Sequence, residues 1–255
     1  MAVPSGAATV ASYASFRSHP TAGRVWVGVD LAFDPMRPRS ARRSSRLRLT
    51  SRDHRTLRWI AEQEAVRTDV VAHLLRRTAP LTVEGTRHVV DRWRRAGLIH
   101  TERLLAGAAP VCWLTTAGLR VVRTRHRSAP PPVGRLDHLH AVSLVRLGLE
   151  QRGARAWTSE RALHRQRASG DAHVADGRFV APNGLATAVE VELTVKGARR
   201  LRAIVDDLTI DYPAVLYVVR GPRVRHAVER AVDALDEHRR VAVVELAQFQ
   251  LQAGP

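Results

Sequence analysis

Apolar side chains recur at every third or fourth position in three successive segments of the first half of the chain, a spacing that predicts short amphipathic helices. Two strand-like segments joined by a turn at 106–110 follow them, and another short helix closes this part. The predicted helices cover 52–64, a segment starting at Thr68, 82–96 and 115–124, and the predicted strands cover 98–105 and 111–114. This part is therefore expected to form a small helical domain with one hairpin.

The second half alternates helical and strand-like patterns, which is typical of a sheet with helices packed against it. Helices are predicted at 136–151, 198–208 and 223–238. Strands are predicted at 154–158, 172–180, 185–193, 213–219 and 241–246. The fold class is therefore α/β, or α+β for the chain as a whole, with two different folded parts.

Composition divides the chain into four segments. Residues 1–50 are rich in Ala, Ser, Pro and Arg and have no sustained periodicity, so they are expected to form a flexible basic arm. Three consecutive prolines in the segment 128–134 cannot continue a helix and favour a stiff linker. We therefore expect one folded domain at 51–127 and a second at 135–255.

Charge narrows the class of partner. The chain of 255 residues has 41 Lys and Arg against 24 Asp and Glu, a formal net charge of +17 that points first to nucleic acid. Residues 51–127 alone hold 15 basic and 7 acidic side chains. The single cysteine, Cys112, excludes an intramolecular disulfide framework, and no secretory signal or apolar run of spanning length is found. These features predict a cytoplasmic protein with no membrane contact.

The third predicted helix leads through Gly97 into the hairpin. The phrases Arg-Trp-Arg-Arg-Ala-Gly-Leu-Ile at 92–99 and Trp-Leu-Thr-Thr-Ala-Gly at 113–118 resemble winged helix-turn-helix regulators, whose recognition helix enters the major groove of duplex DNA. Helical spacing turns Val83, Val90 and Trp93 toward the core and leaves the basic residues for DNA. The candidate DNA-binding residues are Arg87, His88, Arg94 and Arg95 on the helix and Arg103 on the hairpin. A solvated helix face is the alternative explanation of these charges.

Acidic residues of the second domain fall on and beside its strands. Asp171 precedes the predicted strand 172–180, and Glu190 and Glu192 lie two apart on the next strand, so both glutamates share one face. Lys196, the only lysine beside 40 arginines, follows four residues later. Converging carboxylates suit a hard cation such as Mg²⁺, and a nearby ammonium can stabilise charge on a phosphate. Alternating Val and Glu is also typical of a half-buried strand, so both explanations stay open.

This order of elements resembles the PD-(D/E)XK nuclease superfamily, which has a restriction-endonuclease-like fold. The resemblance implies that Asp171 and Glu190 are metal ligands and that Glu192 takes the third motif position. That position is usually a lysine, so this sequence departs from the pattern, and Lys196 would supply a displaced cation. The resemblance implies Mg²⁺-dependent DNA cleavage with Glu192 and Lys196 as catalytic residues, while the departure leaves the activity open.

Three motifs together resemble the replication-relaxation family of actinobacterial plasmids and integrative elements. They are Asp-His-Leu-His at 137–140, Asp-Ala at 171–172 and Ala-Val-Glu-Val-Glu-Leu-Thr-Val-Lys at 188–196. Members of that family join a winged helix to a segment that bears these motifs, and the match spans about 52–220. The resemblance implies a DNA-binding protein of a mobile element.

The sequence His-Leu-His at 138–140 also has the form that relaxases and rolling-circle initiators use to hold a metal beside a nucleophilic tyrosine. On a strand the two imidazoles would share one face, whereas on a helix they would point about 200° apart. The surrounding sequence is helical, and the tyrosines of the chain are Tyr13, Tyr212 and Tyr217. A histidine packed or hydrogen bonded at a helix start is the more ordinary explanation.

Two functions therefore remain open, and both require double-stranded DNA. In the first, the protein is a DNA-binding regulator whose α/β domain serves dimerisation or partner docking. In the second, the α/β domain is a Mg²⁺-dependent endonuclease or nickase that uses Asp171, Glu190, Glu192 and Lys196. Winged-helix proteins often form homodimers, but the sequence does not fix the stoichiometry.

Overall fold

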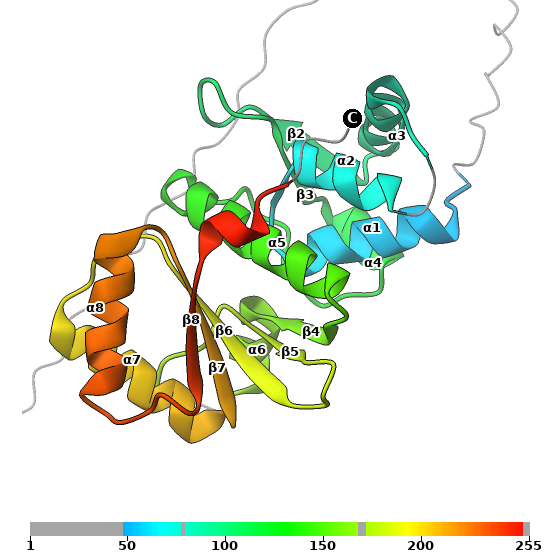
Figure 1. Cartoon of the computed structure of the whole chain (residues 1–255). Helices are drawn as coiled ribbons and strands as arrows, with labels where there is room; N and C mark the ends of the chain where they lie inside the picture. Colours follow the sequence, from blue (N-terminus) through cyan, green and yellow to red (C-terminus); the bar gives the residue numbers. More distant parts are fainter. Residues whose placement is uncertain (1–47, 78–79, 168–171, 252–255) are drawn as a thin grey trace, which may run out of the picture. The chain divides into compact units, whose positions relative to one another are not determined.

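The computed structural model describes residues 48–77, 80–167 and 172–251 (Figure 1). These residues form a mixed α/β protein with one three-stranded and one five-stranded sheet, as the sequence predicts. Residues 1–47 of the predicted arm at 1–50 lie outside the described residues. Asp171 also lies outside them. Within the described ranges, no helix combines the length and the apolar character that a membrane-spanning segment needs.

The N-terminal part packs short helices around the three-stranded sheet, in which β3 pairs antiparallel with both β1 and β2. Its elements are α1 (Ser51–Glu62), β1 (Val66–Arg67), α2 (Thr68–Arg76), α3 (Val83–Arg95), β2 (Ile99–Glu102), β3 (Val111–Leu114) and α4 (Thr116–Val121). Threonine side chains at 50, 82 and 115 accept a backbone N–H three residues later and so begin α1, α3 and α4. The sequence predicts all these elements except β1, whose two residues are too few to show a period.

The helix α3 is anchored by its apolar face. Val89, Val90 and Trp93 are buried, and Trp93 has no exposed surface. The expectation that Val83 also faces the core is wrong, because its side chain is 58% exposed. Val83 is the first residue of α3 and lies a turn before Thr86, the first residue of the helix that is buried.

The C-terminal part is built on the five-stranded sheet, whose strand order is β4-β5-β6-β7-β8. Its elements are η1 (Val133–Arg135), α5 (Leu136–Gln151), β4 (Arg155–Ser159), α6 (Glu160–Gln166), β5 (Gly177–Val180), β6 (Ala186–Glu192), α7 (Ala198–Asp211), β7 (Ala214–Val219), α8 (Pro222–Asp233), β8 (Val241–Glu245) and η2 (Leu246–Phe249). β4, β5 and β6 are antiparallel neighbours, whereas β6, β7 and β8 run parallel. The sequence predicts the five strands and the three long helices but not the short helix α6.

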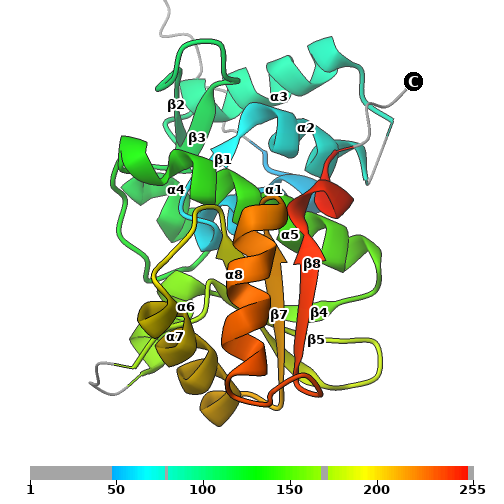
Figure 2. The same ribbon diagram turned by 60° about the vertical axis from the view of Figure 1, so that its left-hand side comes forward.

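Helices cover both faces of this sheet (Figure 2). On one face, Val189 and Val191 of β6 belong to the same hydrophobic cluster as Val145 of α5. On the other face, Ala188 of β6 packs in a second cluster with residues of α7 and α8. Because side chains alternate along a strand, Glu190 and Glu192 share the face of Ala188, as their spacing predicts.

The N-terminal and C-terminal parts share a core. One hydrophobic cluster contains Ile60 and Trp93 from the first part and Val145 and Val189 from the second, and residues 46–255 form one compact unit. The shared core contains residues from both sides of the expected linker at 128–134. The division into domains 51–127 and 135–255 therefore stays a prediction.

A buried arginine, Arg146 of α5, joins the two parts. Its guanidinium lies over the rings of Trp59 and Trp157, at 4.4 Å and 5.6 Å from their centroids. It also donates to Glu62 of α1 at 2.7 Å and to Glu150 at 2.8 Å. A buried cation requires such partners, and these contacts of Arg146 fix α5 against α1.

Candidate nucleic-acid interface and carboxylate cluster

The basic side chains predicted to bind DNA lie together on the outside of α3. We call this region the α3 surface and define it as Arg87, His88, Arg94 and Arg95, all of which are exposed. Glu84 lies 3.6 Å from Arg87 and 3.1 Å from His88, and Asp91 lies 3.3 Å from Arg94. Exposed pairs three or four residues apart contribute only about 0.3–0.5 kcal/mol each, so these cations can exchange their partners for phosphates.

Arg92, on the same helix, has a different environment. Its guanidinium donates to both carboxylate oxygens of Asp53, at 2.9 Å and 2.8 Å, and Asp53 is fully buried. Asp53 also forms a capping box with Thr50 at the start of α1. Arg92 therefore fixes the orientation of α3 against α1. The capping-box spacing is visible in the sequence, but nothing there indicates a partner 39 residues away.

Arg103 lies just after β2, in the segment that joins β2 to β3. It is exposed, and its guanidinium donates to the backbone oxygen of Ala108 within the same segment. This bond ties the two sides of the hairpin loop together. Arg103 thus lies on the hairpin, as predicted, and not on α3.

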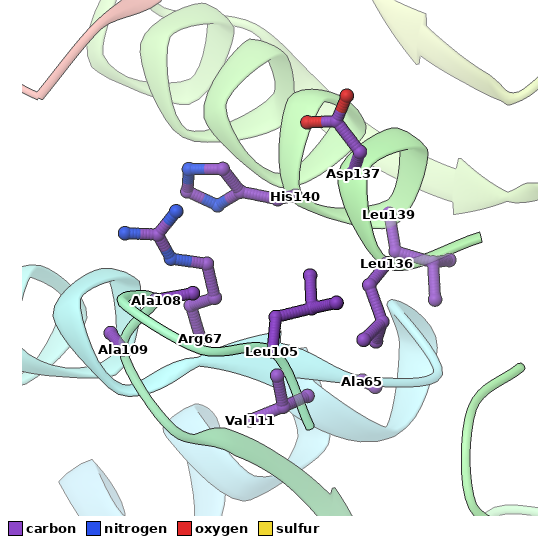
Figure 3. A pocket seen from close by; sticks show the side chains of 10 residues that line it. All are labelled: Ala65, Arg67, Leu105, Ala108, Ala109, Val111, Leu136, Asp137, Leu139 and His140. Carbon is purple, nitrogen blue, oxygen red and sulfur yellow. The ribbon is translucent and has the colours of Figure 1, made fainter. Parts of the chain in front are cut away.

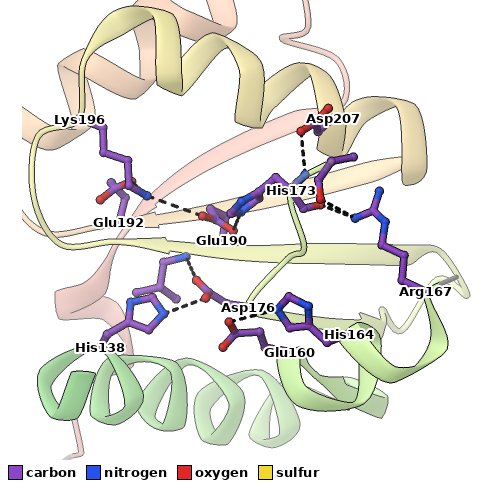
Figure 4. A network of polar contacts seen from close by, with 12 residues as sticks. His138, Glu160, His164, Arg167, His173, Asp176, Glu190, Glu192, Lys196 and Asp207 are labelled. Atoms are coloured by element: carbon purple, nitrogen blue, oxygen red, sulfur yellow. Dashed lines mark hydrogen bonds and ion pairs between the residues drawn. The ribbon is translucent and has the colours of Figure 1, made fainter. Parts of the chain in front are cut away.

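The acidic residues predicted on β6 are buried beside Lys196. Glu190 and Glu192 are each 3% exposed. The Lys196 ammonium lies 2.5 Å from Glu192 Oε2 and 4.0 Å from Glu190 Oε1 (Figure 4). The structure therefore brings together Glu190, Glu192 and Lys196, while Asp171 lies outside the described residues.

A third carboxylate, Asp176, completes what we call the carboxylate cluster, defined as Asp176, Glu190 and Glu192. Asp176 immediately precedes β5, because that strand begins at Gly177 and not at residue 172 as predicted. One oxygen of Asp176 lies 2.7 Å from His138 Nε2, and the other accepts the Val191 N–H at 2.7 Å. The only available signal for Asp176 in the sequence is its position before the short strand.

A histidine closes the remaining side of the cluster. His173 Nε2 lies 2.9 Å from Glu190 Oε2, and the His173 backbone N–H donates to Asp207 at 2.7 Å. Each carboxylate of the cluster thus has its own basic partner: His138 for Asp176, His173 for Glu190 and Lys196 for Glu192. Figure 4 shows these partners reaching the carboxylates from α5, from the segment before β5 and from the segment after β6.

Burial and neighbouring charge shift the pKa values of the cluster. Burial, together with the charge of Asp176, raises the pKa of Glu190 to about 7, against the opposing effect of His173 and Lys196. Burial lowers the pKa of His138, but the hydrogen bond to Asp176 and the negative charges of Asp176, Glu190 and Glu160 together leave that pKa above its usual value. Burial and Glu190 raise the pKa of Tyr217, the register partner of Glu190 on β7. These shifts follow from the burial of the cluster and from the closeness of its charged groups.

Most of the oxygens of the carboxylate cluster that could coordinate a Mg²⁺ ion have protein partners in this arrangement. Both oxygens of Asp176, Oε2 of Glu190 and Oε2 of Glu192 already lie against imidazole, backbone N–H or ammonium groups. No group of three or more His, Cys, Asp or Glu side chains that could hold a metal is found in the described ranges. What this arrangement can do chemically is hold buried negative charge in a fixed, internally neutralised network.

His138 and His140 occupy different environments on α5. His138 faces Asp176, whereas His140 lines a cavity of about 250 Å³ together with Arg67 and Leu105 (Figure 3). The two imidazoles therefore do not converge, as expected for a helix. Tyr217 is fully buried, whereas Tyr212 is partly buried.

No family model matches the chain, and no match is found among curated proteins. The functional conclusion therefore rests on two sets of charges. The α3 surface is exposed and held by weak local pairs, whereas the carboxylate cluster is buried and paired throughout.

Proposed function

We propose that this chain is a DNA-binding protein in which residues 51–127 act as a winged helix-turn-helix and dock the α3 surface against duplex DNA. The observation that carries the proposal is that one face of α3 is buried or anchored in the protein, while the other face exposes basic side chains to solvent. Trp93 is fully buried and Arg92 is fixed by Asp53, while Arg87 and Arg94 extend into solvent. A rigid helix that presents several unburied cations suits the major groove and its flanking phosphates.

The order of helices and strands supports the same proposal. Two helices and then α3 precede the hairpin β2–β3, whose loop carries Arg103. In a winged helix this hairpin is the wing, which contacts DNA beside the recognition helix. Arg103 is the residue that would make that contact.

We infer that the C-terminal part is a nuclease-like domain without turnover and that the protein is a regulator of a mobile element, as the sequence resemblance implies. The order α5-β4-β5-β6-α7-β7 and the position of Asp176 and Glu190 support the nuclease-like fold. The basic partner of each carboxylate supports a structural use of these acids. Dimerisation through this part belongs to the same proposal, and sedimentation of the native chain tests it.

An active Mg²⁺-dependent endonuclease is the second candidate function. It is favoured by the convergence of Asp176, Glu190, Glu192 and Lys196 at the ends of β5 and β6. Conversion of supercoiled plasmid to nicked circles with Mg²⁺ or Mn²⁺ separates the two functions. Nicking that is lost in Glu190→Ala and Asp176→Ala would establish the enzyme, whereas intact plasmid at high protein concentration is the outcome expected for a regulator.

DNA binding itself is tested by measuring the affinity of the native chain for duplexes at several salt concentrations. Each phosphate neutralised contributes about −0.9 to the slope of log affinity against log salt for duplex DNA. We expect tight binding in dilute buffer and a steep negative slope. A chain that does not retain duplex in dilute buffer would contradict the proposal.

A further inference from the structure

A second basic region lies far along the sequence from α3, where the two parts of the chain meet. It is a groove of about 680 Å³ between α1, the segment after α4, and the β4–α6 region. We call it the seam groove and define its basic lining as Arg58, Arg123, Arg125, His126 and Arg165. Glu62 is the only acidic residue of the described chain that lines it.

Most of the positive charge in the seam groove is not neutralised by the described protein. Arg123, Arg125 and Arg165 are exposed and form no ion pair with any described residue. Glu62 lies 3.9 Å from Arg58 but only 2.7 Å from Arg146, so its charge is engaged elsewhere. Burial, with the charges of Arg161 and Arg165, lowers the pKa of His126 to about 4, which is consistent with a positive local potential.

The walls of the groove are held by hydrogen bonds from two partly buried side chains. Arg161 donates to the backbone oxygens of Ala61 in α1 and of Arg127 in the segment after α4, both at 3.0 Å. Ser128 donates to the backbone oxygen of Leu114 at 2.7 Å. The segment that carries Arg123, Arg125 and His126 is therefore held against both parts of the chain and does not need to be ordered by a ligand.

The backbone at Arg123 is unusual for an arginine. Its φ is +54°, in the left-handed region, and it occupies the position after α4 where helices most often have glycine. The Thr124 N–H bonds to Leu119 O and the Arg123 N–H bonds to Arg120 O, both at 3.1 Å, which completes the usual helix end. Glycine is favoured at such a position, whereas here an arginine occupies it and its side chain lines the groove.

We propose that the seam groove binds the phosphodiester backbone of nucleic acid and forms a second contact site, separate from the α3 surface. Guanidinium groups are suited to phosphates because they donate in a planar fork. Four arginines facing one hollow with a single, already engaged carboxylate match a polyanion. This inference rests on the proposed DNA-binding function and adds a second region of the protein that contacts the nucleic acid.

The test compares three variants of the full chain. The groove variant carries Arg123→Gln, Arg125→Gln and Arg165→Gln. The α3 variant carries Arg87→Gln, Arg94→Gln and Arg95→Gln. The control variant carries Arg223→Gln, Arg230→Gln and Arg239→Gln, which removes the same charge from exposed arginines on α8 and the segment after it. Affinity for duplex and for single-stranded DNA is measured between about 50 and 200 mM salt.

We expect the groove variant to bind duplex about tenfold to a hundredfold more weakly and with a slope smaller by about 2 to 3, since each phosphate contact contributes about one. The control variant should stay close to the native chain. A groove variant that behaves like the control would overturn the seam groove and leave the α3 surface standing. An unaffected α3 variant with a weakened groove variant would overturn the proposed docking of α3 and leave the groove standing. If the groove variant differs from the control variant only in its affinity for single-stranded DNA, the groove binds single-stranded and not duplex DNA.

Arg123→Gly provides a second, independent test. Glycine adopts the left-handed backbone conformation without strain, so the melting temperature of the variant should equal or exceed that of the native chain. Its affinity for DNA should be weaker. A variant of equal affinity would show that the Arg123 side chain does not serve phosphate binding.

Discussion

The α3 surface and the carboxylate cluster are opposite solutions to the placement of charge. The α3 surface is basic and exposed, and its ion pairs lie within a single helix. The carboxylate cluster is acidic and buried, and each acid has a basic partner from another segment. Buried pairs must be complete to be tolerated, whereas exposed cations need no protein partner. Exposed cations without a strong protein partner are therefore available for a ligand, whereas buried and paired charges mainly stabilise the fold.

Removing the basic partner of a buried carboxylate should have the largest effect on stability. Lys196→Met leaves Glu192 buried and unpaired, so we expect a loss of about 2–3 kcal/mol in the free energy of unfolding. Urea unfolding measures the loss. Arg199→Met, an exposed change in the adjacent helix, should stay within about 0.5 kcal/mol of the native chain. Equal stabilities for the two variants would contradict a structural use of the cluster.

Arg92 tests the comparison within α3 itself. Arg92→Ala removes the partner of buried Asp53, and we expect a loss of about 2 kcal/mol in unfolding free energy. DNA affinity should also fall, because α3 loses its orientation against α1. Arg94→Ala is the matched change on the exposed side of the helix. If Arg92→Ala unfolds like the native chain, the anchoring role of Arg92 is wrong.

The cluster should also make stability depend on pH. The pKa of His138 is raised in the folded chain, so its stabilisation is complete below the ordinary histidine pKa and is lost as pH rises through the raised value. The difference in melting temperature between the native chain and His138→Gln should therefore be larger at about pH 5.5 than at about pH 8.5. A difference that stays constant across this range would contradict the His138–Asp176 pairing.

The smallest stability effect is expected at the α3 surface. Arg87→Gln and Arg94→Gln remove only exposed pairs, so the unfolding free energy should change by less than about 0.5 kcal/mol. Thermal or urea unfolding of each variant checks this. A loss of several kcal/mol would mean that these cations belong to the fold, and the contrast between the two regions would fail.

Local patterns predicted most of the fold. Apolar periodicity and the glycine after α3 located the helices, and the alternation along β6 placed both glutamates on one face. The short elements β1 and α6 have too few residues to show a period. The start of β5 was misplaced because the residues before Gly177 continue an apolar pattern without pairing in the sheet.

The candidate sites were less predictable than the fold, since they depend on partners distant in sequence. The exposure of Arg87 and Arg94 follows from helical spacing alone. The role of Arg92 depends on Asp53, and the environment of Glu190 depends on His173 and Asp176, which come from other segments. Such contacts arise only when the elements have packed.

The most direct test of the central claim is the duplex affinity of the α3 variant with Arg87→Gln, Arg94→Gln and Arg95→Gln, measured against salt beside the native chain and the α8 control variant. If the α3 surface docks on DNA, this variant binds at least about tenfold more weakly and loses about 2 to 3 from the salt slope, while its melting temperature is unchanged. Affinity and slope equal to those of the control variant would contradict the claim.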